Sequence, residues 1–254
     1  MKPLSPWRVE LLRINRTRRL LVLAALQIFL GATGPLVARY AQQIFSRVSG
    51  SSAVTITVAA PRPADGILGY YKSAMQVGLV ACAVVTALAV CMDSRPALSV
   101  FYRTRSNTSR LMAPRLALTL LAACGTYTLG FLFAWYETLV LIGAPAVVPT
   151  VETWSLGLGY TAFAVVLTFI VSGFSTSSLA SVGTTVAVMI LLPVLGGVRV
   201  LSDWVPSRLT TLPPDIYHGV SHPSPVPPVL VTVAIAVAGG ALALRRVSRR
   251  RVSR

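Results

Sequence analysis

Residues 116–136 read LALTLLAACGTYTLGFLFAWY, a run that contains no Asp, Glu, Lys, Arg or His. A helix needs about 20 mostly apolar residues to cross the hydrocarbon core of a bilayer, where its backbone groups must be hydrogen-bonded within the helix. This stretch is long enough and apolar enough to meet both conditions. It therefore predicts a membrane-spanning helix, and similar runs lie on both sides of it.

The same test finds six such windows in the chain, all free of charged residues and histidine. They cover Leu20–Ala38, Met75–Met92, Leu116–Tyr136, Trp154–Gly173, Leu179–Val198 and Val226–Leu244. Of the 254 residues, 54% are hydrophobic and 12% are charged, whereas soluble domains carry about 25% charged residues. We expect an all-α, multi-pass membrane protein in which residues 20–244 form the spanning domain. The first window is expected to stay as a span, because it is longer than the apolar core of a signal peptide, which is about 7–15 residues.

Basic residues are divided unequally between the two sides that these spans define. Most of the 23 Lys and Arg residues fall in the N-terminal segment, in the connection between the second and third windows, and in the tail 245–254. Cytoplasmic segments carry such an excess, so both termini are predicted to be cytoplasmic. The net charge of +16 is thereby assigned to orientation instead of to nucleic acid, and the tail acts either as a plain stop-transfer anchor or by attracting anionic lipids.

The segment 1–19 has the pattern of an amphipathic helix. Glu10 is its only acidic residue and lies on the face that also carries Arg13 and Arg16. Apolar side chains share a stripe at Leu4, Trp7, Leu11 and Ile14. We expect this helix to lie along the inner membrane surface, where it either anchors to anionic head groups or docks a cytoplasmic partner.

Two weaker patterns concern the packing of the chain. Residues 54–58 alternate between apolar and Thr side chains, which fits either a short strand over the outer mouth or an irregular loop. Small residues at close spacing permit close helix approach in the first and last spans. They are Gly31 with Gly34, Ala234 with Ala238, and Ala236 with Gly240.

A few polar residues near the predicted outer side have candidate roles. His218 and His222 are four residues apart with Asp215 nearby, a spacing that suits a metal on a helix, but the surrounding prolines disfavour a regular helix there. Glu137 and Glu152 fall at the outer ends of the third and fourth spans. There they are either solvated or positioned to meet a cationic substrate.

Several kinds of chemistry require residues that the chain lacks. A phosphate-binding loop needs G-x-x-x-x-G-K-[ST], and neither Lys2 nor Lys72 stands in such a motif. No G-x-S-x-G occurs, and the cysteines at 82, 91 and 124 form no C-x-x-C pair. We therefore expect no enzyme activity and no cofactor bound by this chain. The uncharged windows also disfavour an ion-coupled carrier, which usually keeps a charged group within the bilayer.

The order of these features resembles the permease subunit of a type 2 ATP-binding-cassette (ABC) exporter over nearly the whole chain. The resembling pieces are WRVELLRINRTRRL at 7–20, GATGP at 31–35, FYRTRSNTSRLMAPRLAL at 101–118, WYETLVLIGAP at 135–145, STSSLAS at 175–181 and the late pair Leu212–Pro213.

The resemblance implies two such permeases, identical or related, on two separate cytoplasmic ATPase subunits that bind the ATP and magnesium. It implies that the N-terminal helix and the inner connections receive the motion of the ATPase. The candidate transmission residues are then Glu10, Arg13, Arg103, Arg105 and Arg110. The protein is expected in a bacterial plasma membrane, since the Ala, Val and Arg bias also suggests a GC-rich bacterium. The cargo, whether drug, lipid, peptide or another amphipathic molecule, is left open.

Two other functions fit the same sequence. A membrane scaffold or assembly factor would use the same helix bundle and basic tail without moving any cargo. An ion-coupled secondary transporter would need a titratable group within the spans, which the predicted windows lack.

Overall fold

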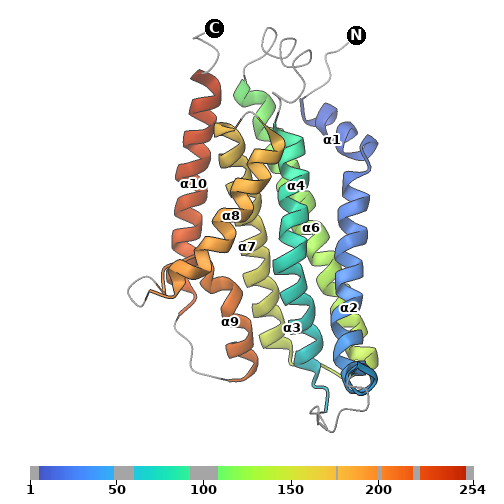
Figure 1. Ribbon diagram of the computed structural model, residues 1–254. Coiled ribbons are helices and arrows are strands. Elements are labelled where there is room, and N and C mark those ends of the chain that lie inside the picture. The colour runs from blue at the N-terminus through green and yellow to red at the C-terminus, as the bar shows by residue number, and fades with distance from the viewer. Residues whose placement is uncertain are drawn as a thin grey trace.

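The computed structural model describes residues 6–48, 60–91, 108–175, 177–198, 202–219 and 224–249. Within these ranges, six helices are long and apolar enough to cross a membrane. They pack into an elongated bundle in which α1 and the C-terminal end of α10 lie at the same end (Figure 1). The prediction of an all-α, multi-pass protein with six spans is confirmed.

The described residues form the following helical elements, in chain order. They are α1 (Pro6–Arg16), α2 (Arg19–Val48), α3 (Pro63–Ser73), the π-helix η1 (Ala74–Gly78), α4 (Leu79–Val90), α6 (Thr108–Leu141), α7 (Val147–Phe174), α8 (Ser178–Gly196), α9 (Arg208–Tyr217) and α10 (Val226–Arg249). The spans are α2, the continuous stretch α3–η1–α4, α6, α7, α8 and α10. The short helix α9 lies at the end of the bundle opposite to α1 (Figure 1).

The spanning helices extend beyond the predicted windows, and they include charged residues. The second span begins at Pro63 instead of Met75 and contains Asp65 and Lys72. Pro63 suits a first helical turn because its missing N–H needs no partner there, and the Asp65 carboxylate accepts a hydrogen bond from the Arg62 N–H at 2.9 Å. The premise that the spans are free of charge therefore holds for the windows but not for the helices.

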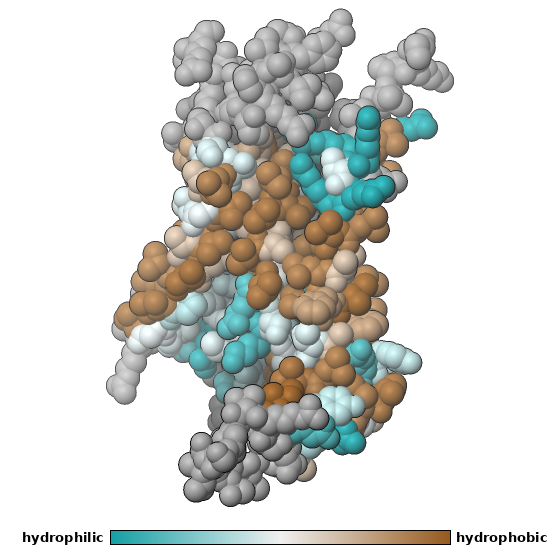
Figure 2. All heavy atoms as spheres, turned by 45° about the vertical axis from the view of Figure 1, so that its right-hand side comes forward, coloured by the Kyte–Doolittle hydropathy of each residue, from teal (hydrophilic) through white to brown (hydrophobic). Residues whose placement is uncertain are grey.

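The helices differ in how much of their surface other helices cover. α7 is the most buried span and lies at the centre, against α4, α6, α8 and α10, while α2 packs along α6 and α3. α8 is the least buried span and diverges from its neighbours toward the α9 end (Figure 1). A band of hydrophobic side chains covers much of the face in view, and hydrophilic ones gather at the end that holds α1 and again in the half toward the opposite end (Figure 2).

Glycines bring the first spans into close contact. A Cβ atom on Gly31 would lie 2.6 Å from the Gly130 carbonyl oxygen, and one on Gly34 would lie 2.9 Å from the Gly66 carbonyl oxygen. The predicted close approach at Gly31 and Gly34 is therefore confirmed. Near this contact the Tyr70 hydroxyl lies 2.8 Å from the Tyr127 carbonyl oxygen.

The last span packs partly through other small residues than the predicted ones. A Cβ on Gly239 would clash with Ile170 of α7, and Gly173 of α7 faces Ala243 of α10. Of the predicted pairs, Ala234 and Ala238 are exposed, whereas Ala236 is half-buried and Gly240 is buried. The four-residue spacing alone could not distinguish the face of an alanine-rich helix that meets its neighbour.

α1 is a helix, but its interfacial placement stays a prediction. Trp7 and Leu11 are exposed, and Glu10 is buried against the bundle. α10 continues through Arg249, so the first part of the predicted tail 245–254 is helical. Residues 54–58, where a strand or a loop was considered, lie outside the described residues.

Candidate functional site

A buried ion pair joins α1 to α6 at one end of the bundle. The Glu10 side chain accepts a hydrogen bond from Arg115 Nε at 3.2 Å and another from Arg13 Nη1 at 3.1 Å. Glu10 is 5% exposed and Arg115 is 6% exposed. The carboxylate of the short helix is therefore held inside the bundle by a guanidinium of a spanning helix.

The same cluster also reaches the end of the second span. Arg13 Nη1 lies 3.5 Å from the carbonyl oxygen of Ala89, in the last turn of α4. A cation is favourable at this position because unpaired carbonyl groups give a helix C-terminus a partial negative charge. Through Glu10, Arg13 and Arg115, α1 is thus connected to both α6 and α4.

Because this ion pair is buried, removing either residue should weaken the attachment of α1 to α6. Removing one partner of a buried ion pair costs about 3–5 kcal/mol, because the other charge is left without compensation in a medium of low dielectric constant. A displacement of α1 away from α6 would break the same contact. Movement of α1 is therefore expected to carry α6 with it.

The structure brings together only some of the predicted transmission residues. Glu10 and Arg13 form the cluster just described, and Arg110 belongs to the first turn of α6. Arg103 and Arg105 lie outside the described residues. Arg115, which is central to the cluster, was missed because it was assigned to the connection before the third span. The one signal in the sequence is that Glu10 is the lone acid of its segment, which does not show that its side chain faces inward.

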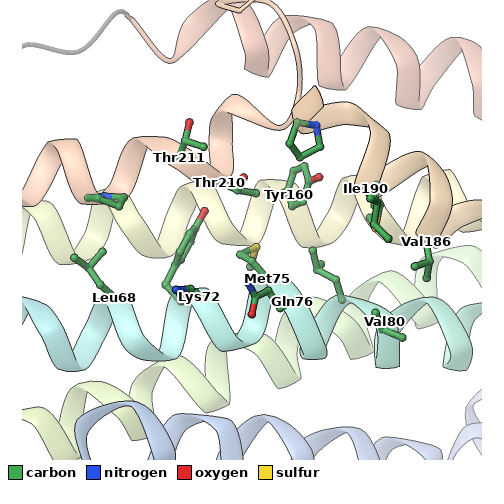
Figure 3. A pocket seen from close by; sticks show the side chains of 15 residues that line it. Leu68, Lys72, Met75, Gln76, Val80, Tyr160, Val186, Ile190, Thr210 and Thr211 are labelled. Carbon is green, nitrogen blue, oxygen red and sulfur yellow. The ribbon is translucent and has the colours of Figure 1, made fainter. Parts of the chain in front are cut away.

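A cavity of about 810 Å³ lies on the flank of the bundle, near the end opposite to α1. One wall is formed by α3, η1 and α4, and the other by α7, α8 and α9 (Figure 3). The polar residues Lys72 and Gln76 belong to the first wall, and Thr210 and Thr211 belong to the second (Figure 3).

Contacts of α9 fix one side of this cavity. The Tyr71 hydroxyl donates a hydrogen bond to the Leu209 carbonyl oxygen at 2.8 Å. Leu209 and Leu212 are buried in a core cluster with Tyr160 of α7. At the end of α9, the Tyr217 hydroxyl lies 2.8 Å from Thr150 Oγ1. Burial raises the pKa of the Tyr217 hydroxyl and the Thr150 hydrogen bond lowers it, with a net increase, so Tyr217 is neutral at physiological pH.

The backbone of the second span is irregular where it lines the cavity. Ala74–Gly78 form a π-helix, and its residues Met75 and Gln76 line the cavity. A π-helical turn inserts an extra residue into an α-helix and is frequent at functional sites. A Cβ on Gly78 would lie 2.8 Å from the Gln27 side chain, so this turn is also packed closely against α2.

Lys72 is the charged residue of this cavity. Its side chain is exposed, and among the described residues no carboxylate lies within 4.0 Å of its ammonium group. A rise of about 1.5 Å per residue places it roughly 14 Å along the helix from Pro63. If Pro63 lies at the membrane surface, Lys72 lies deeper than the headgroup layer, which is about 5–7 Å thick.

The remaining polar residues do not assemble into a site. Contrary to expectation, α9 continues through Pro213 and Pro214, but it ends at Tyr217. His218 follows it and is exposed, while His222 lies outside the described residues. The two histidines therefore do not share a regular helix, and among the described residues no group of three or more metal-ligating side chains is found.

The two acidic residues at the ends of the third and fourth spans differ in environment. Glu152 is exposed on α7, as a solvated side chain would be. Glu137 is half-buried on α6, and its Oε2 atom has no hydrogen-bond partner among the described residues.

Comparison with known proteins does not assign this chain to a family. No protein-family model matches this chain, and no relative is found among curated proteins. The functional argument therefore depends on the two sites described above, the α1 junction of Glu10, Arg13 and Arg115 and the cavity beside Lys72.

Proposed function

We propose that this chain is the permease subunit of an ATP-driven ABC exporter. Two copies, or one copy and a related permease, would form the pathway for an amphipathic cargo in a bacterial plasma membrane. A separate cytoplasmic subunit would bind ATP with magnesium and hydrolyse the ATP. The order of the sequence features supports this proposal, as do the six spans and the α1 junction.

The α1 junction is the observation that carries the proposal. A short helix outside the spans is attached to α6 by the buried contact between Glu10 and Arg115, and α6 packs against α2, α3 and α7. Movement applied to α1 by a partner would thus reach four spans. Such a ligand-driven shift between two packed arrangements requires differential contacts in the two states, and breaking or keeping this ion pair supplies one.

Reconstitution with an ATPase tests the proposal. The full chain would be placed in nanodiscs and mixed with an ABC ATPase encoded beside it, and both binding and ATP hydrolysis would be measured. We expect binding and stimulated hydrolysis with the native chain. In the Glu10→Gln variant, we expect binding to persist and stimulation to fall at least about fivefold, since the neutral amide holds Arg115 less strongly. If the native chain neither binds the ATPase nor stimulates it, the proposal is wrong.

An ion-coupled carrier is the second candidate, and Lys72 is the observation that favours it. A cation within a spanning helix is the kind of residue that such carriers use. Transport by this route would depend on a proton or ion gradient in vesicles that hold the chain alone. No comparable feature favours a scaffold, which would bind a partner stably and give no flux in the same vesicles.

A further inference from the structure

The cavity beside Lys72 has a positive charge that no described acidic residue balances. Among the described residues, Lys72 is the one charged side chain that lines it, and none of those lining it is acidic. A cation at this depth in a bilayer is unfavourable unless water or an anion accompanies it. Because the described residues provide no carboxylate within 4.0 Å, the complementary group must come from outside the described part of the chain.

Polar groups are concentrated around this cation. Gln76 lies one turn further along the same wall, and Thr210 and Thr211 stand opposite on α9 (Figure 3). The Gln76 amide can donate a hydrogen bond to an oxygen atom, whereas the Thr210 and Thr211 hydroxyls donate theirs to the Ser207 and Arg208 carbonyl oxygens. Together, the ammonium group of Lys72 and the amide of Gln76 suit the oxygen atoms of a carboxylate or phosphate headgroup.

The other half of the cavity is apolar. Val80 on α4 stands opposite Val186 and Ile190 on α8 (Figure 3). Val80 and Ile190 are exposed, so this part is open to the flank of the bundle. A volume of about 810 Å³ lies within the range of about 300–1,000 Å³ that is usual for small-molecule sites.

The two halves follow one another along the spanning helices. Val80 lies about 12 Å further along the helix than Lys72, at about 1.5 Å per residue, and toward the end that holds α1. The polar half is therefore nearer the end opposite to α1, which the charge distribution predicts to face outward. A lipid of the outer leaflet has the same order, with its headgroup outside and its chain toward the bilayer centre.

We propose that this cavity binds an anionic amphiphile from the outer leaflet, with its acidic headgroup on Lys72 and its acyl chain between α4 and α8. Binding of this kind requires the membrane placement of the chain but no ATPase. It would define the class of cargo if the exporter proposal holds. Because amphiphile binding is measured on the chain alone, an absence of binding would leave the exporter proposal unaffected. Failure of the exporter proposal would likewise leave the binding proposal unaffected.

A headgroup comparison tests the role of Lys72. Binding of oleate and of its uncharged analogue oleyl alcohol would be measured on the purified full chain in a neutral detergent. We expect oleate to bind the native chain at least about tenfold more tightly. Lys72→Gln should abolish this preference and Lys72→Arg should retain it. As the matched control, Arg39→Gln removes an exposed cation of α2 outside the cavity and should change nothing.

Three results would overturn the headgroup assignment. The native chain could bind both probes equally, Lys72→Gln could keep the preference, or Arg39→Gln could abolish it to the same extent. A photoactivatable fatty acid provides a readout on the native chain, which is needed if a variant does not fold. It should label the peptide that contains Lys72 or the one that contains Ile190, and labelling confined to other spans would count against the site.

A second pair of variants tests the position of the acyl chain. Ile190→Trp should fill the apolar half and weaken oleate binding about tenfold. Leu191→Trp changes the neighbouring residue of α8, which is similarly exposed but does not line the cavity, and should leave binding unchanged. Equal effects of the two substitutions, or no effect of either, would contradict the assignment.

Competition distinguishes a bilayer lipid from a single-chain molecule. If phosphatidylglycerol displaces oleate from the native chain and phosphatidylcholine does not, the site accepts a resident anionic phospholipid. If neither displaces oleate, the site is confined to single-chain anionic amphiphiles. Both results agree with an acidic headgroup on Lys72. If both lipids displaced oleate to the same extent, this assignment would be contradicted.

Discussion

The ion pair of Glu10 and Arg115 attaches α1 to the bundle. The sequence singled out Glu10 because it is the only acid of its segment, but it offered no direct sign that the side chain faces inward. The apolar stripe of α1 instead predicts a helix whose charged face, including Glu10, is solvated. Burial of a charge depends on a partner that is distant in sequence, and here the partner is 105 residues away.

The ion pair makes a prediction about stability. Arg115→Ala should lower the free energy of unfolding by about 1–3 kcal/mol, because the buried Glu10 carboxylate loses one charged hydrogen-bond donor and keeps only Arg13. The double variant Glu10→Leu with Arg115→Met should recover most of that loss. Thermal unfolding in detergent measures both. Arg16→Ala is the control on the exposed face of α1, and a loss there as large as that of Arg115→Ala would refute the explanation.

Two glycines of α6 allow a matched test of close packing. A Cβ on Gly130 would lie 2.6 Å from the Gln27 carbonyl oxygen, whereas nothing lies within 4 Å of a Cβ on Gly125. Gly130→Ala should therefore cost about 1–3 kcal/mol through overpacking. Gly125→Ala should be neutral or stabilising by up to about 1 kcal/mol, because alanine favours a helix. Unfolding measurements that rank the two variants in the reverse order would contradict the described packing of α2 on α6.

Hydrophobicity predicted the existence of the spanning helices but not their ends. Windows without charge located all six, because about 20 apolar residues leave few alternatives to a membrane span. They began the second span too late, since Lys72 interrupted the apolar run while Pro63 and Asp65 started the helix earlier. The π-helix at Ala74–Gly78 and the helix through Pro213 and Pro214 were not predicted, because tertiary contacts decide both.

The position of α9 depends on a hydrogen bond that can be removed alone. Tyr71→Phe deletes the hydroxyl that donates to the Leu209 carbonyl oxygen and should cost about 1 kcal/mol. Amide hydrogen exchange in residues 208–217 should become faster, while exchange in α2 should not change. Tyr40→Phe, which alters an exposed tyrosine of α2, is the control. Unchanged exchange in α9 after Tyr71→Phe would show that other contacts hold this helix.

At the scale of the bundle, two sites lie at opposite ends. The α1 junction connects a short helix to the spans at one end, and α9, which contributes to the cavity beside Lys72, lies at the other end (Figure 1). Charge asymmetry predicts which end is cytoplasmic, and the proposal of an exporter requires that this be the α1 end, because an ATPase acts in the cytoplasm. The sequence could predict the orientation but not the cavity, which is built from residues of several helices.

Side-specific labelling of cysteines tests this requirement most directly. In a chain whose native cysteines at 82, 91 and 124 are replaced by serine, Thr17→Cys would mark the α1 end and Ala60→Cys the opposite end. Both positions are exposed. A membrane-impermeant maleimide applied to intact cells should label Ala60→Cys and should reach Thr17→Cys only after permeabilisation. Labelling of Thr17→Cys in intact cells would place α1 outside the cell and contradict a permease driven by a cytoplasmic ATPase.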